Sequence, residues 1–367
     1  MKSVLGIICE YNPFHIGHSY HIAASELVMN EHAPVVCVMS GDFVQRGESA
    51  IFPKHYRAEQ AVKSGADLVV ELPLPWCLAS AEGFARGGVS ILSALGVTHI
   101  SFGSECGDIE LLKSTAAAMA GDFQSGLREL IRSRPELSYA SAVTELCGSP
   151  LLLEPNNLLG IEYIRAINDI NGEIIPITVK RFNRHDGEDS AKDIRARIYA
   201  GELPGNPVNR DILETAIISR LRMFDKDYFS TLPNSADGLG NRLYDAIRTE
   251  CTLEGIYAAA KTKRFPMSAI RRLAMCAALG INDEMSSGLP PYIRVLSFNE
   301  KGRQYLSSVK DSCRVPIITL PKEIYSLSEN AQRVFASGVC AKDLYELGMD
   351  QENKMCGNDY RLGPVIV

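Results

Sequence analysis

The sequence predicts an α/β fold: a doubly wound parallel sheet, of the Rossmann-like kind, followed by a second, mainly α-helical domain. Short, wholly apolar segments recur along the first half of the 367-residue chain, and a turn and a helical stretch follow each of them. The approaches to three of these segments carry glycine where a helix ends in the left-handed conformation, at Gly65, Gly96 and Gly172. After about residue 200 this rhythm stops, and helical stretches follow one another.

The expected strands are buried on both faces. Continuous apolar runs rich in β-branched residues are typical of parallel strands that helices cover on both sides. Pro176 lacks an amide hydrogen, which places the last of these strands at an edge of the sheet or at a bulge. The expected strands are residues 4–10, 35–39, 68–72, 99–102 and 174–179.

A boundary between two domains is expected near residue 200. The segment 201–207 holds two prolines and two glycines, a composition typical of linkers. We therefore expect an α/β domain over residues 1–200 and a mainly helical domain over residues 201–367. The helices expected in the second domain are residues 211–223, 240–251, 253–261, 267–279 and 331–336.

Composition and cysteine usage indicate an ordinary cytoplasmic protein. The chain is 46% hydrophobic and 22% charged, and its net charge is −6, so a nucleic-acid partner would have to meet a local basic patch. The ten cysteines include no C-x-x-C pair, and several lie in apolar runs, as reduced thiols do. We expect neither a signal peptide nor a membrane-spanning segment.

The clearest functional signal follows the first expected strand, where three of the seven histidines fall within seven residues. The segment His15-Ile16-Gly17-His18 lies at the start of an amphipathic helix, where free backbone N–H groups and the helix dipole attract phosphate. Gly17 allows a nucleotide to approach the backbone, and both histidines can donate hydrogen bonds to a triphosphate. The turn therefore predicts adenylyl chemistry that uses ATP.

A metal site, a dinucleotide-binding site and a P-loop are less consistent with the sequence than an ATP site at this turn. His15, His18 and His21 are spaced three apart, but no carboxylate or cysteine follows at ligand spacing on that helix, so we predict no metal site. The sequence also lacks G-x-G-x-x-G after a strand and G-x-x-x-x-G-K-[ST], the fingerprints of dinucleotide-binding and P-loop proteins.

His15-x-Gly17-His18 resembles the signature of the class I tRNA-synthetase/nucleotidyltransferase superfamily. Segments along nearly the whole chain are similar to the bacterial tRNA(Met) cytidine acetate ligase family: residues 6–21, 39–48, 67–73, 102–105, 156–163, 261–265 and 294–296. The resemblance implies an enzyme that activates acetate with ATP and Mg²⁺. It then passes the acetyl group to N4 of the wobble cytidine of elongator tRNA(Met). It implies no protein partner.

The same resemblance implies an ATP site with His15 and His18 as catalytic residues. Ser190 suits a helix N-cap, and Lys192 and Arg195 can neutralise phosphate in a second phosphate motif. The full set expected to bind ATP is Ile8, Cys9, Glu10, Tyr11, Asn12, Pro13, Phe14, His15, Ile16, Gly17, His18, Ser19, Tyr20, His21, Gly103, Asn156, Asn157, Arg181, Ser190 and Arg195.

A basic cluster in the second half is the candidate surface for tRNA. Five basic residues lie within twelve positions with no acid among them: Lys261, Lys263, Arg264, Arg271 and Arg272. A solvated helix face is the alternative explanation for this cluster, as it is for Lys54 and Arg57, which could also contact phosphate or tRNA.

Two other functions stay open at this point. One is an adenylyl- or cytidylyltransferase that acts on a small phosphate ester. The other is an RNA-binding module whose nucleotide site is degenerate.

Overall fold

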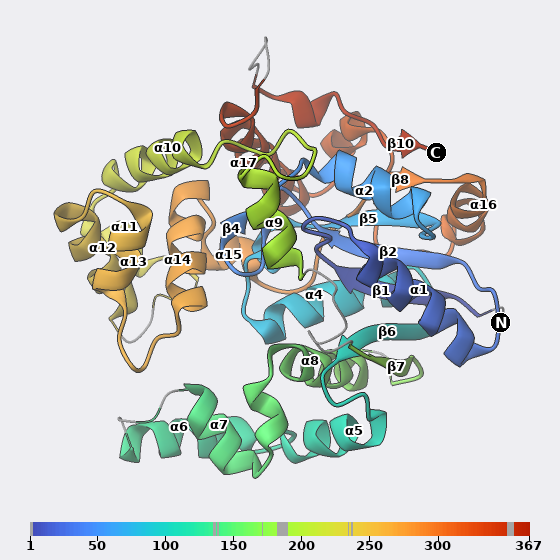
Figure 1. Ribbon diagram of the computed structural model, residues 1–367, viewed down its shortest axis with the longest axis horizontal. Helices are drawn as coiled ribbons and strands as arrows, with labels where there is room; N and C mark the ends of the chain where they lie inside the picture. Colours follow the sequence, from blue (N-terminus) through green and yellow to red (C-terminus); the bar gives the residue numbers. More distant parts are fainter. Residues whose placement is uncertain are drawn as a thin grey trace.

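The computed structural model describes residues 3–134, 137, 139–170, 172–181, 190–233, 235, 238–350 and 356–367. A central sheet with strand order β10-β8-β5-β2-β1-β6-β7 organises the protein (Figure 1). Strand β1 (Leu5–Cys9) is parallel to β2 (Val35–Ser40) on one side and to β6 (His99–Ser104) on the other. Next to β2 lies β5 (Leu68–Leu72), and β7 (Ile175–Lys180) lies beyond β6. The predicted doubly wound α/β fold is confirmed, and the strand order reverses at β1.

Helices cover both faces of this sheet. Alternate residues of the central strands point to opposite faces. Ile7, Cys37 and Val69 pack with α1 (Ile16–Met29) and α2 (Lys54–Lys63). On the other face, α4 (Ala81–Ala94) and α8 (Pro155–Ile170) cover residues such as Ile8, Val38 and Val70. Because both faces are covered, every residue of β2 is buried, as a continuous apolar run predicts.

Three glycines were expected to adopt the left-handed conformation before a strand, and this prediction was correct for two of them and wrong for the third. Gly65 and Gly96 adopt positive φ angles of +119° and +76° between a helix and the next strand. Gly172 does not adopt the left-handed conformation, because the turn before β7 does not require it. Pro176 lies in β7, the edge strand, where its missing amide hydrogen costs no ladder bond to a further strand.

The C-terminal part of the chain returns to the sheet, which differs from the expected separate domain over residues 201–367. Strand β8 (Ile293–Phe298) runs antiparallel to β5, and β9 (Ile317–Ile318) and β10 (Val365–Ile366) run parallel to β8. In Figure 1 the orange β8 lies beside the blue β5. Sequence analysis missed β8 because Arg294 interrupts its apolar run, although every residue of the strand is buried.

Helices that follow residue 200 form a unit with a core of its own, at the left of Figure 1. The unit comprises α10 (Arg210–Arg222), α11 (Lys226–Ser230), α12 (Leu239–Thr249), α13 (Leu253–Ala260) and α14 (Met267–Leu279). Four of these match the expected helices closely. The expected helix 331–336 is part of the longer α17 (Glu329–Leu347), which contributes Phe335 to the main core and Tyr345 to the helical unit.

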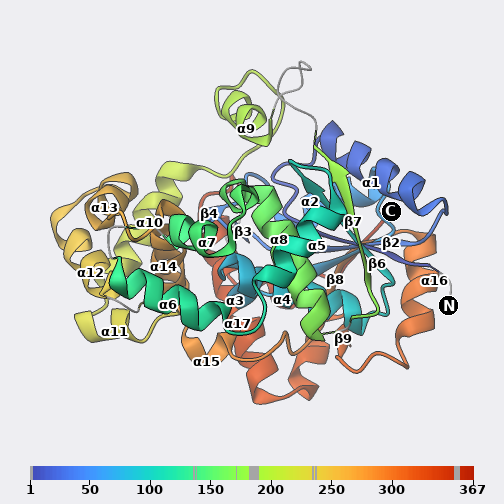
Figure 2. The ribbon, with the colours of Figure 1, turned by 90° about the horizontal axis from the view of Figure 1, so that it is seen from below.

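Several shorter elements surround these two cores. Helix α9 (Ala191–Tyr199) lies in front of the other elements near the centre of Figure 1 and projects from the body of the molecule at the top of Figure 2. The other elements are α3 (Leu74–Cys77), α5 (Ile109–Ala118), α6 (Phe123–Ser133), α7 (Tyr139–Cys147), α15 (Asp283–Ser286), α16 (Glu300–Val309), the hairpin of β3 (Phe43–Val44) and β4 (Glu48–Ser49), and the 3₁₀ helices η1 (Pro150–Leu153), η3 (Pro321–Ser326) and η4 (Asn358–Tyr360). Within the described ranges, no helix has both the length and the apolar character needed to cross a membrane.

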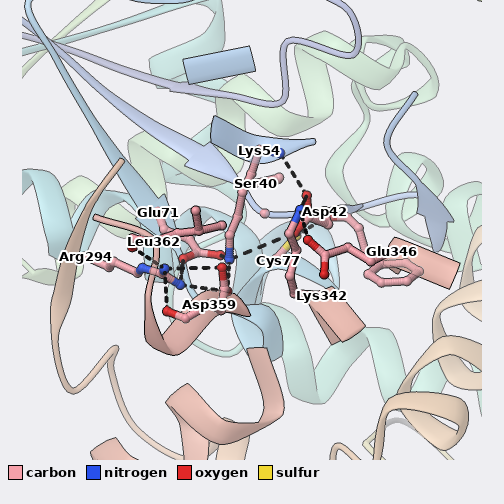
Figure 3. Close-up of polar contacts among 12 residues, drawn as sticks. Ser40, Asp42, Lys54, Glu71, Cys77, Arg294, Lys342, Glu346, Asp359 and Leu362 are labelled. Atoms are coloured by element: carbon pink, nitrogen blue, oxygen red, sulfur yellow. Dashed lines mark hydrogen bonds and ion pairs between the residues drawn. The ribbon is translucent and has the colours of Figure 1, made fainter. Parts of the chain in front are cut away.

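A buried ionic network ties the C-terminal segment to the strand ends (Figure 3). Lys54 Nζ lies 2.8 Å from Glu71 Oε1 and also pairs with Asp359 Oδ2. Arg294 Nη1 lies 2.7 Å from Asp359 Oδ2 and 3.4 Å from Glu71 Oε2. All four side chains are buried. Burial alone would raise the pKa of Asp359, but Lys54 and Arg294 hold it well below its usual range.

The network continues into α17. Lys342 Nζ lies 3.3 Å from Glu346 Oε1 and 4.0 Å from Asp42 Oδ1. Asp42 Oδ1 also accepts a hydrogen bond of 2.8 Å from the backbone N–H of Lys54. The network therefore joins the ends of β2 and β5 to β8, α17 and η4.

Replacing Asp359 by alanine is expected to destabilise the protein by about 3–5 kcal/mol, because it leaves Lys54 and Arg294 as buried cations without their shared partner. Urea unfolding monitored by circular dichroism measures the change. As a control, Glu300→Ala removes a carboxylate that pairs on the surface of α16 and should leave the midpoint unchanged. Equal stability of the Asp359 variant and the native chain would show that the network contributes little.

Candidate active site at the carboxyl ends of the strands

The predicted phosphate-binding turn lies where β1 ends and α1 begins. Tyr11, with φ of +45°, turns the chain out of the strand, and His15 is the N-cap of α1. The ring Nδ1 of His15 accepts a hydrogen bond from the backbone N–H of Gly17 (3.1 Å). The Nδ1 of His18 accepts one from the backbone N–H of His15 (3.2 Å).

These two bonds determine where the imidazoles carry their protons. Because each Nδ1 accepts a hydrogen bond, the proton of each neutral ring is on Nε2. Neither His15 Nε2 nor His18 Nε2 has a hydrogen-bond partner among the described residues. The turn therefore presents two N–H donors at the N-terminus of a helix, which suits the oxygens of a polyphosphate.

All three histidines of the segment are neutral at pH 7. Burial lowers the pKa of His15, and the charge of Arg181 lowers it further. Burial and the neighbouring His15, His21 and Arg181 hold the pKa of His18 well below its usual range. Burial, assisted by Arg181, lowers the pKa of His21 to about 4, and its Nε2 lies 2.9 Å from Ser101 Oγ.

Two glycines are needed for close approaches at this edge. A Cβ on Gly17 would lie 2.9 Å from Cε1 of the His15 ring, so a side chain there would displace the ring. A Cβ on Gly103, in β6, would lie 3.1 Å from Cγ of Arg181. The structure thus brings Gly103 and Arg181 together, as the sequence predicted for residues of one site.

Asn156 and Asn157 have different surroundings at the start of α8. Asn157 is 2% exposed, and its Oδ1 accepts hydrogen bonds from the backbone N–H groups of Glu105 (2.9 Å) and Cys106 (3.1 Å). Glu105 in turn accepts from the backbone N–H of Asn157 (2.8 Å). Asn157 therefore holds the junction of β6 and α8, whereas Asn156 Oδ1 lies 3.5 Å from Arg181 Nη1.

Helix α9 carries Arg195 to the turn. Ser190 caps this helix by accepting a hydrogen bond from the backbone N–H of Asp193 (3.3 Å), as expected. Arg195 Nη1 donates a hydrogen bond of 2.6 Å to the backbone carbonyl of Asn12. Arg195 thus contacts the turn at Asn12 and the charge of Arg181 acts on His15, while the segment 182–189 between the two arginines lies outside the described residues.

Lys54 and Arg57 are buried, so neither possibility considered for them from the sequence is correct. Arg57 is 1% exposed, and its guanidinium donates to the backbone carbonyls of Glu10 (2.5 Å), Ser40 (3.2 Å), Gly41 and Phe52 (2.9 Å). It pairs with no carboxylate of the described residues within 4 Å. Arg57 therefore joins the carboxyl ends of β1 and β2, a role that no local sequence pattern could reveal.

The β3–β4 hairpin connects the site to the helical unit. Arg271 Nη1 pairs with Glu48, and a Cβ on Gly47 would lie 2.6 Å from the backbone of Arg271 and Arg272. Arg271 and Arg272 are only partly exposed for this reason. Of the predicted basic cluster, Lys261, Lys263 and Arg264 are exposed, in the connection between α13 and α14.

In the part of the chain that the structure describes, no three His, Cys, Asp or Glu side chains cluster in a way that could hold a metal ion. All ten cysteines are free thiols.

Comparisons with known proteins identify the family to which the chain is similar. A family model described as HIGH Nucleotidyl Transferase matches residues 1–359. The chain is 32% identical to a tRNA(Met) cytidine acetate ligase of Halothermothrix orenii, with 99% of each chain covered, and 33% identical to one of Caldicellulosiruptor bescii, with 99% and 98% covered. A crystal structure of Thermotoga maritima TmcAL bound with alpha-thio ATP matches with a TM-score of 0.90, 30% identity and 100% of both chains covered.

The burial of His21 leads to a prediction on its titration. Its ring should become protonated with a midpoint of about pH 4, measured from the imidazole ¹⁵N shifts of the labelled protein. Because the folded-state pKa is lowered, the neutral ring stabilises the fold above about pH 6.5, and this contribution is lost as the pH falls through the folded-state pKa. A midpoint near 6.5 would show that the ring is solvated.

Proposed function

Because this chain belongs to the tRNA(Met) cytidine acetate ligase family of HIGH nucleotidyltransferases and is an ATP-dependent ligase, we propose the following reaction. The enzyme converts acetate and ATP into acetyl-adenylate and pyrophosphate. It then transfers the acetyl group to N4 of the wobble cytidine of elongator tRNA(Met). The observation that carries this proposal is the pair of Nε2–H donors at the N-terminus of α1, at the point where the strand order reverses.

In the first step, the triphosphate lies over the start of α1. An acetate oxygen attacks the α-phosphorus, the bond to the β-phosphate breaks, and pyrophosphate leaves with the electron pair. Negative charge grows on the phosphate oxygens, and fixed donors at His15 and His18 stabilise it without reorganisation. Arg181, whose charge acts on His15, and Arg195, which contacts Asn12, add positive charge.

Mg²⁺ enters this reaction as the counter-ion of ATP, a part of the substrate that neutralises phosphate charge. The described residues offer no carboxylate or histidine cluster for a resident ion, which fits binding through the phosphates.

In the second step, the acceptor base reaches the mixed anhydride. A wobble cytidine lies in a single-stranded anticodon loop, where an unstacked base can enter a protein pocket. The exposed Lys261, Lys263 and Arg264 on the helical unit are the candidate contacts for the tRNA backbone, since the protein carries a net charge of −6. We propose that the enzyme acts in the cytoplasm, on the tRNA pool.

The reaction is tested by incubating the purified protein with ATP, isotope-labelled acetate and bulk tRNA, followed by mass spectrometry of the nucleosides. Label in N4-acetylcytidine of elongator tRNA(Met) is the expected result. Turnover on a phosphate ester, without acetate-dependent exchange of pyrophosphate into ATP, would contradict the proposal.

His18→Ala is expected to reduce acetate-dependent ATP–pyrophosphate exchange by at least about 100-fold, because it removes a donor to the phosphates. His32→Ala, at an exposed histidine beyond the other end of α1, is the matched control and should exchange normally. Near-normal exchange in the His18 variant would refute its assigned role.

Replacing Lys261, Lys263 and Arg264 together by alanine should weaken tRNA binding and lower the slope of log Kd against log salt by about one for each lost contact. Acetate-dependent exchange should stay unchanged, because these residues belong to the helical unit. The double variant Arg303→Ala/Lys310→Ala, on α16 and at its C-cap on the opposite side of the molecule (Figure 1), removes basic side chains away from the helical unit and should bind tRNA normally. Unaltered binding by the triple variant would place the tRNA elsewhere.

A further inference from the structure

Carboxylates occupy the carboxyl ends of four adjacent strands of the sheet. Glu10 follows β1, Asp42 lies two residues after β2, Glu71 is the penultimate residue of β5, and Glu105 follows β6. The strand order β5-β2-β1-β6 places all four along the edge where ligands bind in this fold. A carboxylate there can be structural, or it can take part in the chemistry, and its hydrogen bonds distinguish the two.

Three of the four carboxylates hold the structure together. Asp42 accepts from the backbone N–H of Lys54 and faces Lys342. Both oxygens of Glu71 are used, one by Lys54 Nζ at 2.8 Å and the other by Arg294 Nη1 at 3.4 Å. Both oxygens of Glu105 are used at the start of α8, by Asn156 and by the backbone of Asn157.

Glu10 differs from these three. Its Oε1 accepts a hydrogen bond of 2.7 Å from the backbone N–H of Gln45, and its backbone carbonyl is held by Arg57. Its Oε2 has neither a hydrogen bond nor an ion pair with any residue that the structure describes. The side chain is partly exposed. Glu10 is therefore held in place at one oxygen, and the described residues leave the other without a partner.

Glu10 is also close to the reacting groups of the proposed reaction. It lies two residues before Asn12, whose carbonyl binds Arg195, and five residues before His15. The acetyl carbonyl of the adenylate is joined to the α-phosphate through one oxygen, so the transfer takes place beside the phosphate-binding turn. The end of β1 is the part of the sheet nearest to that turn.

We propose that Glu10 is the general base of the acetyl transfer, an inference that rests on the proposed function. N4 of cytosine attacks the carbonyl carbon of acetyl-adenylate and a C–N bond forms. The bond between that carbon and the phosphate oxygen breaks, and AMP leaves with the electron pair. The proton that N4 loses passes to Oε2 of Glu10 and from there to solvent.

The chemistry of the acceptor requires such a group. The lone pair of the exocyclic amine is delocalised into the cytosine ring, so the amine is a weak nucleophile, and it must lose a proton as the amide forms. General-base catalysis typically contributes about 10²–10⁴ in rate. His15 and His18 cannot supply the base, because each Nε2 already carries a proton and each Nδ1 accepts a backbone hydrogen bond.

The surroundings of Glu10 suit this role. Burial raises the pKa of its carboxyl above the ordinary value, which makes it a stronger base, and the backbone N–H of Gln45 and the neighbouring arginines moderate the shift. The charged and titratable groups that face it are Arg46, Arg57, Arg195, Cys77 and Tyr163.

The two half-reactions allow a direct test with the full-length enzyme and the variant Glu10→Gln. Acetate-dependent ATP–pyrophosphate exchange should fall far less than transfer, although Glu10 is among the residues expected to lie near ATP, because adenylation needs no proton transfer to Glu10. Single-turnover transfer from preformed acetyl-adenylate to tRNA should fall by at least about 100-fold. A parallel loss in both half-reactions, or normal transfer, would overturn the inference.

Two further measurements separate a base from a structural residue. The transfer rate of the native enzyme should fall as the pH falls through the raised pKa of Glu10, and the residual rate of Glu10→Gln should be independent of pH over that range. Glu10→Asp should restore part of the transfer together with the pH dependence. A native transfer rate that does not change with acidic pH would also overturn the inference, without reliance on any variant.

Gln45→Ala is the matched control, because it keeps the backbone N–H that binds Glu10, and its ratio of transfer to exchange should equal the native ratio. A native enzyme that neither exchanges with acetate nor modifies tRNA would refute the proposed function and this inference together. A native enzyme that acetylates tRNA while Glu10→Gln transfers normally would refute only the role of Glu10.

Discussion

The buried guanidinium of Arg57 is the contact on which the geometry of the site depends. Removing a cation from water costs several kcal/mol, and most buried arginines recover this from a carboxylate. Arg57 instead donates to carbonyls at the ends of β1 and β2 and to Phe52, near the end of the loop that leads into its own helix. The carbonyl of Glu10 lies where the chain leaves β1 for the phosphate-binding turn. The carbonyls of Ser40 and Gly41 lie where the chain leaves β2 for the β3–β4 hairpin. One side chain thus sets the separation of the two loops that border the site.

The charged network around Lys54 has a complementary role on the other side of the same strand ends. It neutralises groups that lie far apart in the sequence, from Asp42 to Asp359, and so connects the last residues of the chain to the first strands. Because β8 and β10 extend the sheet beyond β5, the helical unit is an insertion between two parts of one α/β body. The hairpin that pairs with Arg271 then links this insertion to the site.

In the proposed reaction, histidine side chains donate hydrogen bonds to the phosphates and a carboxylate accepts a proton. Histidines whose Nδ1 atoms are occupied by the backbone can only donate, and donors suit a phosphate that gains negative charge. A carboxylate with one free oxygen can accept a proton. The first arrangement comes from a local capping motif of four residues. The second depends on which of the strand-end carboxylates has an oxygen that the described part of the chain leaves without a partner.

The sequence alone determined the α/β class, the strands β1, β2, β5, β6 and β7 of the sheet, the position of the His15–His18 turn after β1, and four helices of the insertion. These features depend on local patterns, namely apolar runs, glycines and helix periodicity, which a short window contains. Only the tertiary structure decided the return of β8 to the sheet, the burial of Lys54 and Arg57, and the separation of exposed Lys261 from partly buried Arg271. Each of these depends on partners many residues away, because a charged side chain has the same local pattern whether water or a distant chain segment surrounds it.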